Sequence, residues 1–311
     1  MTESQRQSKK AAFLPLFFLA AMIFILIRTE ESRADLQSGL RLCAENVIPS
    51  LFPHLVLSEL FVSNLSFSSN GSRFSRFFCR LFRLPSAAAP VILIGAICGF
   101  PVGARLSAQL YREGFINKED AEILCAYANN TGPAFVISGV GAALFGSVRI
   151  GVFLFCSEIL ASLICLLGSS FFRSKTFNST DALPLRAPSP FVESVKSASY
   201  AILNICGFVL FFSLVTGVFC RTFSSFSLPF SALFEVTNAC KNASLLRFSA
   251  PRTALFFTAF SIGFGGLSAG MQSALCMKEG ELSFGRYLPR KFLQGFLSVF
   301  FFYLLTEAIA I

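Results

Sequence analysis

Long apolar segments constrain this chain more than any other feature of its sequence. Apolar runs of about 17 to 27 residues recur along the 311 residues, separated by short polar stretches. A helix needs about 20 apolar residues to cross the roughly 30 Å hydrocarbon core of a bilayer. Only 14% of the residues are charged, against about 25% in a typical soluble domain. The sequence therefore predicts an all-α polytopic membrane protein.

The apolar segments predict about eight transmembrane helices. They lie at 11–27, 42–63, 87–110, 120–145, 148–172, 197–220, 253–277 and 287–310. A further segment, 228–240, is too short to cross and is expected to be interfacial or re-entrant. Lys and Arg divide almost evenly between the two sides of this topology, so the usual excess of positive charge does not give its orientation.

These segments divide the chain into four regions. They are an N-terminal basic segment with the first helix (1–41), a first half (42–172), a polar linker (173–196) and a second half (197–311). We expect the first apolar run to be a retained span and not a signal peptide, because no clear small-x-small cleavage site follows it. Pro184, Pro188 and Pro190 lie among polar residues, a composition typical of a linker.

Several classes of function are disfavoured by what the chain lacks. Its net charge of +9 is dispersed over the loops, so it offers no basic track for nucleic acid. Ten cysteines never fall closer than nine residues apart, and His54 is the single histidine, a pattern without metal-site spacing. Neither GxSxG, a Walker loop nor HExxH occurs. We expect no enzymatic activity, no cofactor and no bound metal.

Three apolar segments are interrupted where they should lie deepest in the membrane. The interruptions are Gly99-Phe100-Pro101-Val102-Gly103, Asn129-Asn130-Thr131-Gly132-Pro133 and Gly263-Phe264-Gly265-Gly266. Proline removes a backbone donor, and glycine adopts conformations that a helix does not use. The sequence therefore predicts a broken helix at each of these positions.

Broken helices in a membrane need partners for their backbone. A freed N–H or C=O group in lipid costs several kcal/mol, so breaks persist only where protein, water or a ligand satisfies them. Many secondary transporters bind their solute at such breaks near the midplane. The alternative is that glycine and proline only permit close packing or kinks. A solute site requires the breaks to converge around a polar cavity, whereas packing does not.

A weak internal repeat accompanies the breaks. Gly99-Phe100, then a helix and Arg112-Glu113-Gly114, is echoed by Gly263-Phe264, then a helix and Lys278-Glu279-Gly280. Duplicated halves with breaks at corresponding positions indicate an inverted repeat with a site at its interface. Chance similarity between segments rich in glycine and phenylalanine is the alternative.

Polar side chains near the breaks are candidate solute-binding groups. Arg105 lies in an apolar segment and needs a partner, either a solute carboxylate or one of the acidic residues Glu59, Glu122 and Glu158. The amides and hydroxyl of 129–131 suit a polar solute or Na⁺, and they equally suit hydrogen bonds between helices. The predicted binding set is Gly99, Phe100, Pro101, Gly103, Arg105, Asn129, Asn130, Thr131, Glu235, Thr237, Asn238, Gly263, Gly265, Gly266, Ser268 and Gln272.

Five motifs, in order along the chain, resemble the YlbJ-type sporulation integral membrane proteins. They are Asn46-Val-Ile-Pro-Ser-Leu-Phe-Pro53 with Leu57-Ser58-Glu59-Leu60, Cys98-Gly-Phe-Pro-Val-Gly-Ala-Arg105, Ala128-Asn-Asn-Thr-Gly-Pro-Ala-Phe135, Leu233-Phe234-Glu235-Val-Thr237-Asn238 and Gly263-Phe-Gly-Gly-Leu-Ser268. The likeness covers about residues 40 to 310. The chain departs from the family pattern at Met271-Gln272 and at Thr131, where serine is commoner.

The resemblance implies a place in the nucleoside-recognition, or Gate, group, which is similar to concentrative nucleoside transporters. It implies a multi-pass protein of the mother-cell or outer forespore membrane that transports dipicolinate during spore formation. Arg105, helix N-termini, and Phe100 or Phe264 would suit this planar dianion. A transporter of nucleosides or another metabolite, and a membrane scaffold without transport, are the alternatives.

The expected partners are membrane lipid and the small solute. Na⁺ at the uncharged polar groups, or H⁺ on Glu59, Glu158, Glu235 or Glu307, is a candidate coupling ion. The sequence leaves a homo-oligomer open. A scaffold would need sizeable soluble surfaces, and no connecting loop exceeds roughly 25 residues, which disfavours that alternative.

Overall fold

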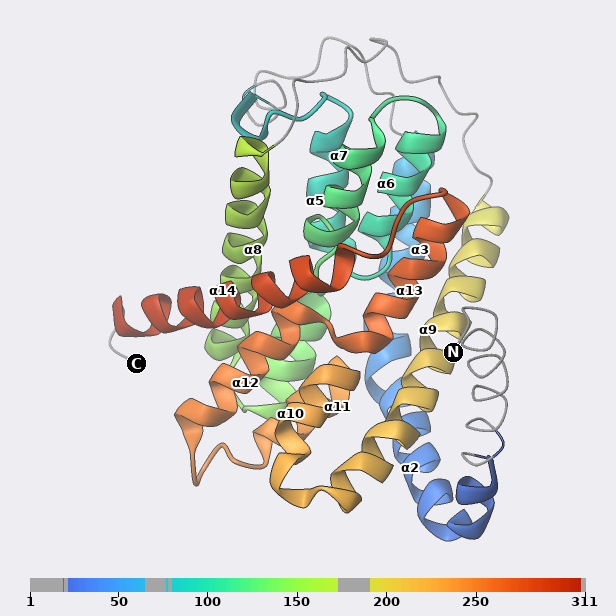
Figure 1. Ribbon diagram of the computed structural model, residues 1–311, viewed down its shortest axis with the longest axis vertical. Helices are drawn as coiled ribbons and strands as arrows, with labels where there is room; N and C mark the ends of the chain where they lie inside the picture. The colour runs from blue at the N-terminus through green and yellow to red at the C-terminus, as the bar shows by residue number, and fades with distance from the viewer. Residues whose placement is uncertain (1–18, 20–21, 65–76, 78–79, 173–190, 309–311) are drawn as a thin grey trace, which may run out of the picture.

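The computed structural model describes residues 19, 22–64, 77, 80–172 and 191–308. Every regular element in these ranges is a helix (Figure 1), so the predicted all-α architecture is confirmed. Most of the predicted first span, 11–27, and residues 173–190 of the predicted linker lie outside the described residues. Helix α9 already begins at Phe191, so the end of that linker is helical.

The first half opens with one long helical rod. In it α2 (Thr29–Leu42), the wider turns of η1 (Cys43–Val47) and α3 (Ile48–Asn64) follow one another without interruption. The side chains of Asn117 and Ser147 accept backbone N–H groups at the starts of α7 and α8, as polar N-cap residues do. The remaining elements of this half are α5 (Ala88–Cys98), α6 (Val102–Arg112), α7 (Lys118–Tyr127), η2 (Ala134–Leu144) and α8 (Val148–Phe171).

The second half also opens with a long helix, α9 (Phe191–Thr222). Pro251 occupies the first turn of α12, where its missing N–H costs nothing. The elements that follow α9 are η3 (Ser224–Phe226), α10 (Ser227–Phe234), α11 (Val236–Ser244), α12 (Pro251–Phe264), α13 (Gly266–Glu279) and α14 (Tyr287–Ala308).

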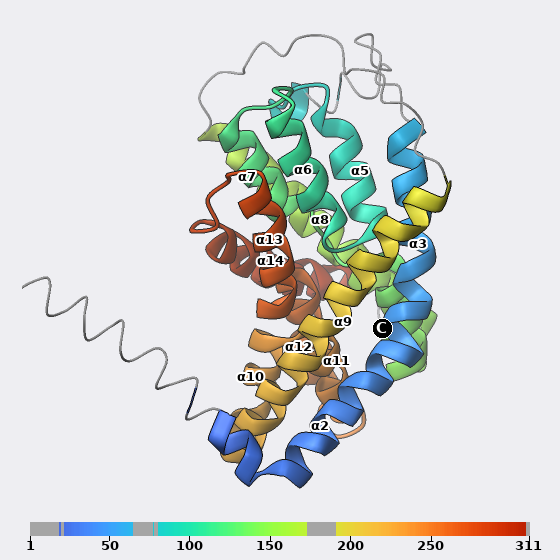
Figure 2. The same ribbon diagram turned by 90° about the vertical axis from the view of Figure 1, so that its right-hand side faces the viewer.

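Two short helix pairs enter the molecule and fold back without crossing it. Helices α5 and α6 have 11 residues each, about 16 Å of helix, which is half of a hydrocarbon core. They pack against one another in the upper half of Figures 1 and 2. The segment 87–110, counted from hydropathy as one crossing, is therefore a hairpin. Helices α10 and α11 form a second hairpin at the opposite end, in the segment 228–240 that was expected to be interfacial or re-entrant.

Two other spans are broken but continue. Helix α7 is followed by η2, and α12 by α13, in the same general direction (Figure 1). Three stretches of the described chain are long and apolar enough to cross a membrane: Val148–Phe171, Phe191–Thr222 and Pro251–Glu279, the last comprising α12 and α13. Helix α14 lies across α8 and α12 at mid-height (Figure 1). The segment 287–310 therefore does not run parallel to its neighbours, as a simple crossing would.

Both halves contain the same kinds of element in the same order. Each has a long helix, a hairpin, a broken span and a final helix. In this order the hairpin break at Gly99 corresponds to the hairpin break at Glu235, and the break at 129–133 corresponds to the break at Gly263. The sequence echo instead links Gly99 with Gly263, so it joins elements of different kinds. The inverted repeat itself stays a prediction.

Apolar side chains pack around the central breaks and also cover the outer surface. Buried clusters include Leu124 on α7, Leu166 on α8 and Ile262 on α12. Phe211 on α9 and Phe296 on α14 are more than half exposed. Apolar side chains on the outside suit contact with lipid tails.

Candidate functional site

The breaks of both halves meet at mid-height. Gly99 has a φ of 77°, and a Cβ there would lie 2.9 Å from the backbone nitrogen of Gly132. Gly265 has a φ of 81°, and its Cβ would lie 2.7 Å from the Phe100 ring. Both positions demand glycine, because they combine a left-handed backbone with a close neighbour. Gly266 likewise approaches the backbone of Phe234 and Glu235. The breaks therefore converge, which is the geometry that a solute site requires.

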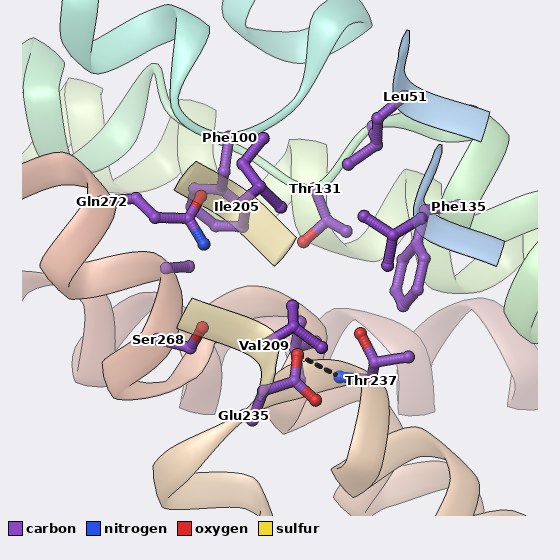
Figure 3. A pocket seen from close by; sticks show the side chains of 14 residues that line it. Leu51, Phe100, Thr131, Phe135, Ile205, Val209, Glu235, Thr237, Ser268 and Gln272 are labelled. Carbon is purple, nitrogen blue, oxygen red and sulfur yellow. Dashed lines mark hydrogen bonds between the residues drawn. The ribbon is translucent and has the colours of Figure 1, made fainter. Parts of the chain in front are cut away.

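A small cavity lies between these breaks. Its volume is about 50 Å³, room for a few water molecules at about 10–15 Å³ each. Figure 3 shows Thr131 and Phe135 on one side of it and Glu235 and Thr237 on the other. The cavity is lined by Val47, Leu51, Phe100, Thr131, Gly132, Phe135, Ile205, Val209, Glu235, Val236, Thr237, Ser268, Ala269 and Gln272.

Glu235 is the acidic residue at the cavity. Its side chain is 2% exposed, and it forms the break between α10 and α11. Its two carboxylate oxygens accept the backbone N–H groups of Thr237 at 3.0 Å and Asn238 at 2.7 Å. A carboxylate at this position caps α11 and complements the positive end of its dipole. Glu235 thus brings a buried carboxyl group to the cavity wall.

Asn129 and Asn130 join helices and do not line the cavity. The side chain of Asn129 accepts the Ala104 N–H at 3.3 Å and donates to Ser273 Oγ at 2.8 Å. Asn130 receives a hydrogen bond of 2.7 Å from Gln294 and donates to Ser162 Oγ at 3.3 Å. These bonds satisfy the interrupted backbone region of the first half with groups from α6, α8, α13 and α14. These two amides therefore occupy the positions expected from the alternative of hydrogen bonding between helices.

Thr131 belongs to both the network and the cavity. Its hydroxyl lines the cavity and donates to the carbonyl of Ile262 at 3.1 Å. Its backbone N–H donates to Glu158 Oε1 at 2.6 Å. The break in the first half is thereby tied to α8 and to the break in the second half.

Lys291 and Gln294 on α14 belong to this core and are absent from the predicted set. Lys291 on α14 is 0% exposed, and its ammonium donates to the Asn129 carbonyl at 3.2 Å and to Gln294 at 2.9 Å. It also lies 5.1 Å from the centre of the Phe100 ring. Sequence reasoning missed Lys291 because a lysine at the edge of an apolar run is typical of an interfacial anchor. The signal that could have found it is Gln294, one helical turn later in the same run.

Arg105 lines a second and larger cavity of about 260 Å³. Its guanidinium pairs with Glu59 and donates to Ser197 Oγ at 3.2 Å. Of the three acidic partners considered for it, Glu59 is the one in contact. We call this cavity the vestibule; it is lined by Pro101, Arg105, Ser197, Tyr200, Ala201, Asn204, Ile205, Phe208, Gln272, Leu275, Cys276 and Glu279. Ile205 and Gln272 line both cavities and therefore separate them.

The other predicted residues take structural positions around this site. A Cβ at Gly103 would overlap the carbonyl oxygen of Ala128, and one at Gly263 would overlap the side chain of Ser298. The Asn238 side chain donates to Ser213 Oγ at 2.9 Å, away from the cavity lining. Ser268 lines the cavity, and its buried hydroxyl has no hydrogen-bond partner among the described residues. Whether these residues bind a solute stays a prediction.

Comparison with known proteins adds one relative. The sporulation integral membrane protein YlbJ of Bacillus subtilis (strain 168) is 27% identical over 333 aligned positions, which cover 94% of this chain and 81% of that protein. The chain is a relative of the YlbJ-type proteins. The resemblance expected from the five motifs is confirmed, and an integral membrane location agrees with the apolar helices. No family model and no solved structure matches the chain.

Thr131 and Gln272, two positions at which the sequence is expected to depart from the YlbJ-type pattern, lie at the cavities. Thr131 lines the central cavity. Gln272 lies between the central cavity and the vestibule. The described residues contain no cluster of three metal-ligating side chains.

Proposed function

We propose that the protein carries a small anionic heterocyclic solute, dipicolinate, across a membrane during spore formation. The observation that carries this proposal is the convergence of the broken helices on a cavity that adjoins the Arg105 vestibule. Broken helices that only pack would not need to meet around a space. Discontinuous spans that converge from two halves are the usual construction of a secondary transporter site.

The vestibule has the chemistry to receive a carboxylate. The Arg105 side chain is 46% exposed although its partner Glu59 is close, so part of its guanidinium fork is free to contact a solute. Arginine binds carboxylates through two parallel hydrogen bonds. Tyr200 and Phe208 add apolar surface for a flat ring. A planar ring with carboxylates therefore suits this cavity.

The central cavity is the second site on the proposed solute path, after the vestibule. Its volume of about 50 Å³ is too small for a heteroaromatic ring with two carboxylates. Passage therefore requires Ile205 and Gln272, which lie at its boundary with the vestibule, to move apart. Alternating access of this kind, in which a closed central site opens to one side at a time, is how such carriers work.

The setting of the proposal comes from the relative. YlbJ is a sporulation integral membrane protein by name, and dipicolinate is the solute that the family resemblance implies. We place the protein in the mother-cell or outer forespore membrane on the same basis. Nucleosides remain the competing solute class because the Gate group that the resemblance implies is similar to concentrative nucleoside transporters.

Counterflow in proteoliposomes tests the proposal. Vesicles that contain the purified full-length protein and are loaded with unlabelled dipicolinate should take up labelled dipicolinate faster than the same vesicles without internal dipicolinate. Unlabelled uridine should not compete. An Arg252→Ala variant serves as a control, because Arg252 is 86% exposed and lies on the distant end of α12. If neither solute exchanges, the transport proposal is wrong; if only uridine exchanges, the solute class is wrong.

A further inference from the structure

The ammonium of Lys291 is bound as a metal cation would be. Its two acceptors, the Asn129 carbonyl at 3.2 Å and Gln294 Oε1 at 2.9 Å, are uncharged oxygens. The Phe100 ring faces it at 5.1 Å, and an aromatic face attracts cations. Carbonyls of unwound helices are also the groups that hold Na⁺ in many coupled carriers. Lys291 therefore fills a place where a coupling cation could bind.

Glu158 lies in the same core with one oxygen unused. It is 0% exposed, and its Oε1 accepts the Thr131 N–H at 2.6 Å. Its Oε2 has no hydrogen-bond partner among the described residues. Glu158 and Lys291 interact electrostatically but are not within ion-pair distance in the described structure. A buried carboxylate oxygen without a donor is costly, and protonation or a water molecule relieves that cost.

We propose that Lys291 takes the position of a coupling cation and that Glu158 is the proton-binding group, so that solute movement is driven by H⁺ and is independent of Na⁺. This inference rests on the proposed transport function. It assigns the coupling ion, which the sequence left open between Na⁺ and H⁺. The tethered ammonium excludes Na⁺ from the carbonyl site, and the free carboxylate oxygen accepts the proton.

A proton also answers an electrostatic problem in the proposed path. Glu235 places a carboxyl group on the wall of the central cavity, and Glu158 lies behind Thr131. Each of these carboxyl groups repels a dianionic solute when it is ionised, strongly so at low dielectric. A proton bound to Glu158 removes one negative charge from the core while the solute passes and is released with it.

The groups that face Glu158 leave few other carriers for this proton. Helix α14 contributes Lys291 and helix α11 contributes Cys240. The element η2 has no titratable side chain. Helix α12 has one, Arg252, whose guanidinium lies 3.9 Å from the Glu307 carboxylate. Tyr127 on α7 interacts with Cys165 on α8, and Cys165 interacts electrostatically with Lys291. Among the described residues, Glu158 and the helix cap Glu235 are thus the acidic groups of this core.

Ion gradients imposed on proteoliposomes test the inference. With the full-length protein, a pH gradient of one unit, acid outside, should raise dipicolinate accumulation by up to about tenfold for each proton moved. A Na⁺ gradient at constant pH should leave it unchanged. Accumulation that follows Na⁺, or that follows neither gradient, overturns the inference. Absence of counterflow under all conditions overturns the proposed transport function instead, so the two failures are distinguishable.

A matched pair of variants assigns the proton to Glu158. In Glu158→Gln the amide oxygen can still accept the Thr131 N–H, but the side chain no longer binds a proton. We therefore expect the ratio of uptake under the pH gradient to uptake by counterflow alone to fall close to one. Glu122→Gln is the control, because Glu122 is also buried and also accepts one backbone N–H, from Ser283 at 2.9 Å, far from the breaks. If Glu158→Gln keeps the wild-type ratio, Glu158 is not the proton-binding group.

Discussion

Arg105 and Lys291 are two cations next to the same breaks, and they are held in opposite ways. Arg105 is 46% exposed in the vestibule and pairs with a carboxylate, Glu59. Lys291 is 0% exposed and binds carbonyl oxygens of Asn129 and Gln294. Exposed pairs contribute at most about 1 kcal/mol to stability, whereas buried charges are costly to leave without partners. The difference indicates that Lys291 maintains the fold of the breaks, while Arg105 remains available to the proposed solute.

The strongest test of this difference is Lys291→Met. The substitution leaves the Asn129 carbonyl and Gln294 Oε1 without a donor and Glu158 without its cation. Breaking a buried charge network costs about 3–5 kcal/mol, so we expect that loss of unfolding free energy. Denaturant titration in mild detergent, followed by circular dichroism, measures it.

The matched control for Lys291→Met is Lys241→Met. Lys241 lies on the outside of α11 and makes one hydrogen bond, to Ser38 Oγ at 3.3 Å. We expect a change below about 0.5 kcal/mol for this surface position. Equal stability of the two variants would show that the buried lysine is not a structural cation.

A double-mutant cycle between Lys291 and Glu158 sharpens the comparison further. Residues in one network show coupling energies of about 0.5–3 kcal/mol. We expect Glu158→Gln to cost less in the Lys291→Met background than in the wild type, because the neutral side chain needs no counter-charge. Thermal unfolding of the four proteins in one detergent gives the coupling. The cycle of Lys291→Met with Glu122→Gln should be additive within about 0.5 kcal/mol.

Sequence reasoning found the vestibule cation and not the buried one for a physical reason. Arg105 lies in mid-segment beside a break, so its cost in lipid is visible from its position. Lys291 lies at the edge of an apolar run, and such lysines usually reach the interface. Helix α14 instead begins beside the breaks and lies across α8 and α12, which places this edge at the centre of the molecule. A tertiary direction of this kind leaves no trace in hydropathy.

The breaks and the helical class could be predicted because they depend on local chemistry. Proline and glycine at 99–103, and glycine at 263–266, interrupt helices wherever they stand. Whether a chain crosses or turns back after a break depends on contacts with distant elements. The hairpin of α5 and α6 was therefore counted as one crossing. The partner of Arg105 could be narrowed to three carboxylates, but the choice of Glu59 required the packing of α3 against α9.

Glu235 is an intermediate case, a buried carboxyl group whose oxygens accept hydrogen bonds from its own helix. Its carboxylate accepts two backbone N–H groups at the start of α11, so it needs no side-chain cation. Removal of an N-cap side chain costs about 0.5–2 kcal/mol, and we expect this range for Glu235→Ala. Glu235→Gln, which keeps one acceptor oxygen, should lose less. A loss as large as that of Lys291→Met would mean that Glu235 belongs to the charge network of the core.

Arg105→Ala should have a small effect on stability and a clear effect on solute capture. Loss of its partly exposed pair with Glu59 should lower the free energy of unfolding by less than about 1 kcal/mol. Loss of a charged hydrogen bond to a solute carboxylate, about 1.5–3 kcal/mol, should raise the KM of dipicolinate counterflow by at least about tenfold. Arg105→Lys should recover part of this effect because lysine keeps the charge but lacks the planar fork.

The salt concentration should affect the same KM. Because the charge of Arg105 is partly exposed, raising the salt concentration should raise the wild-type KM and should change the KM of Arg105→Ala little. A large loss of stability with unchanged KM would reverse the roles of the two cations.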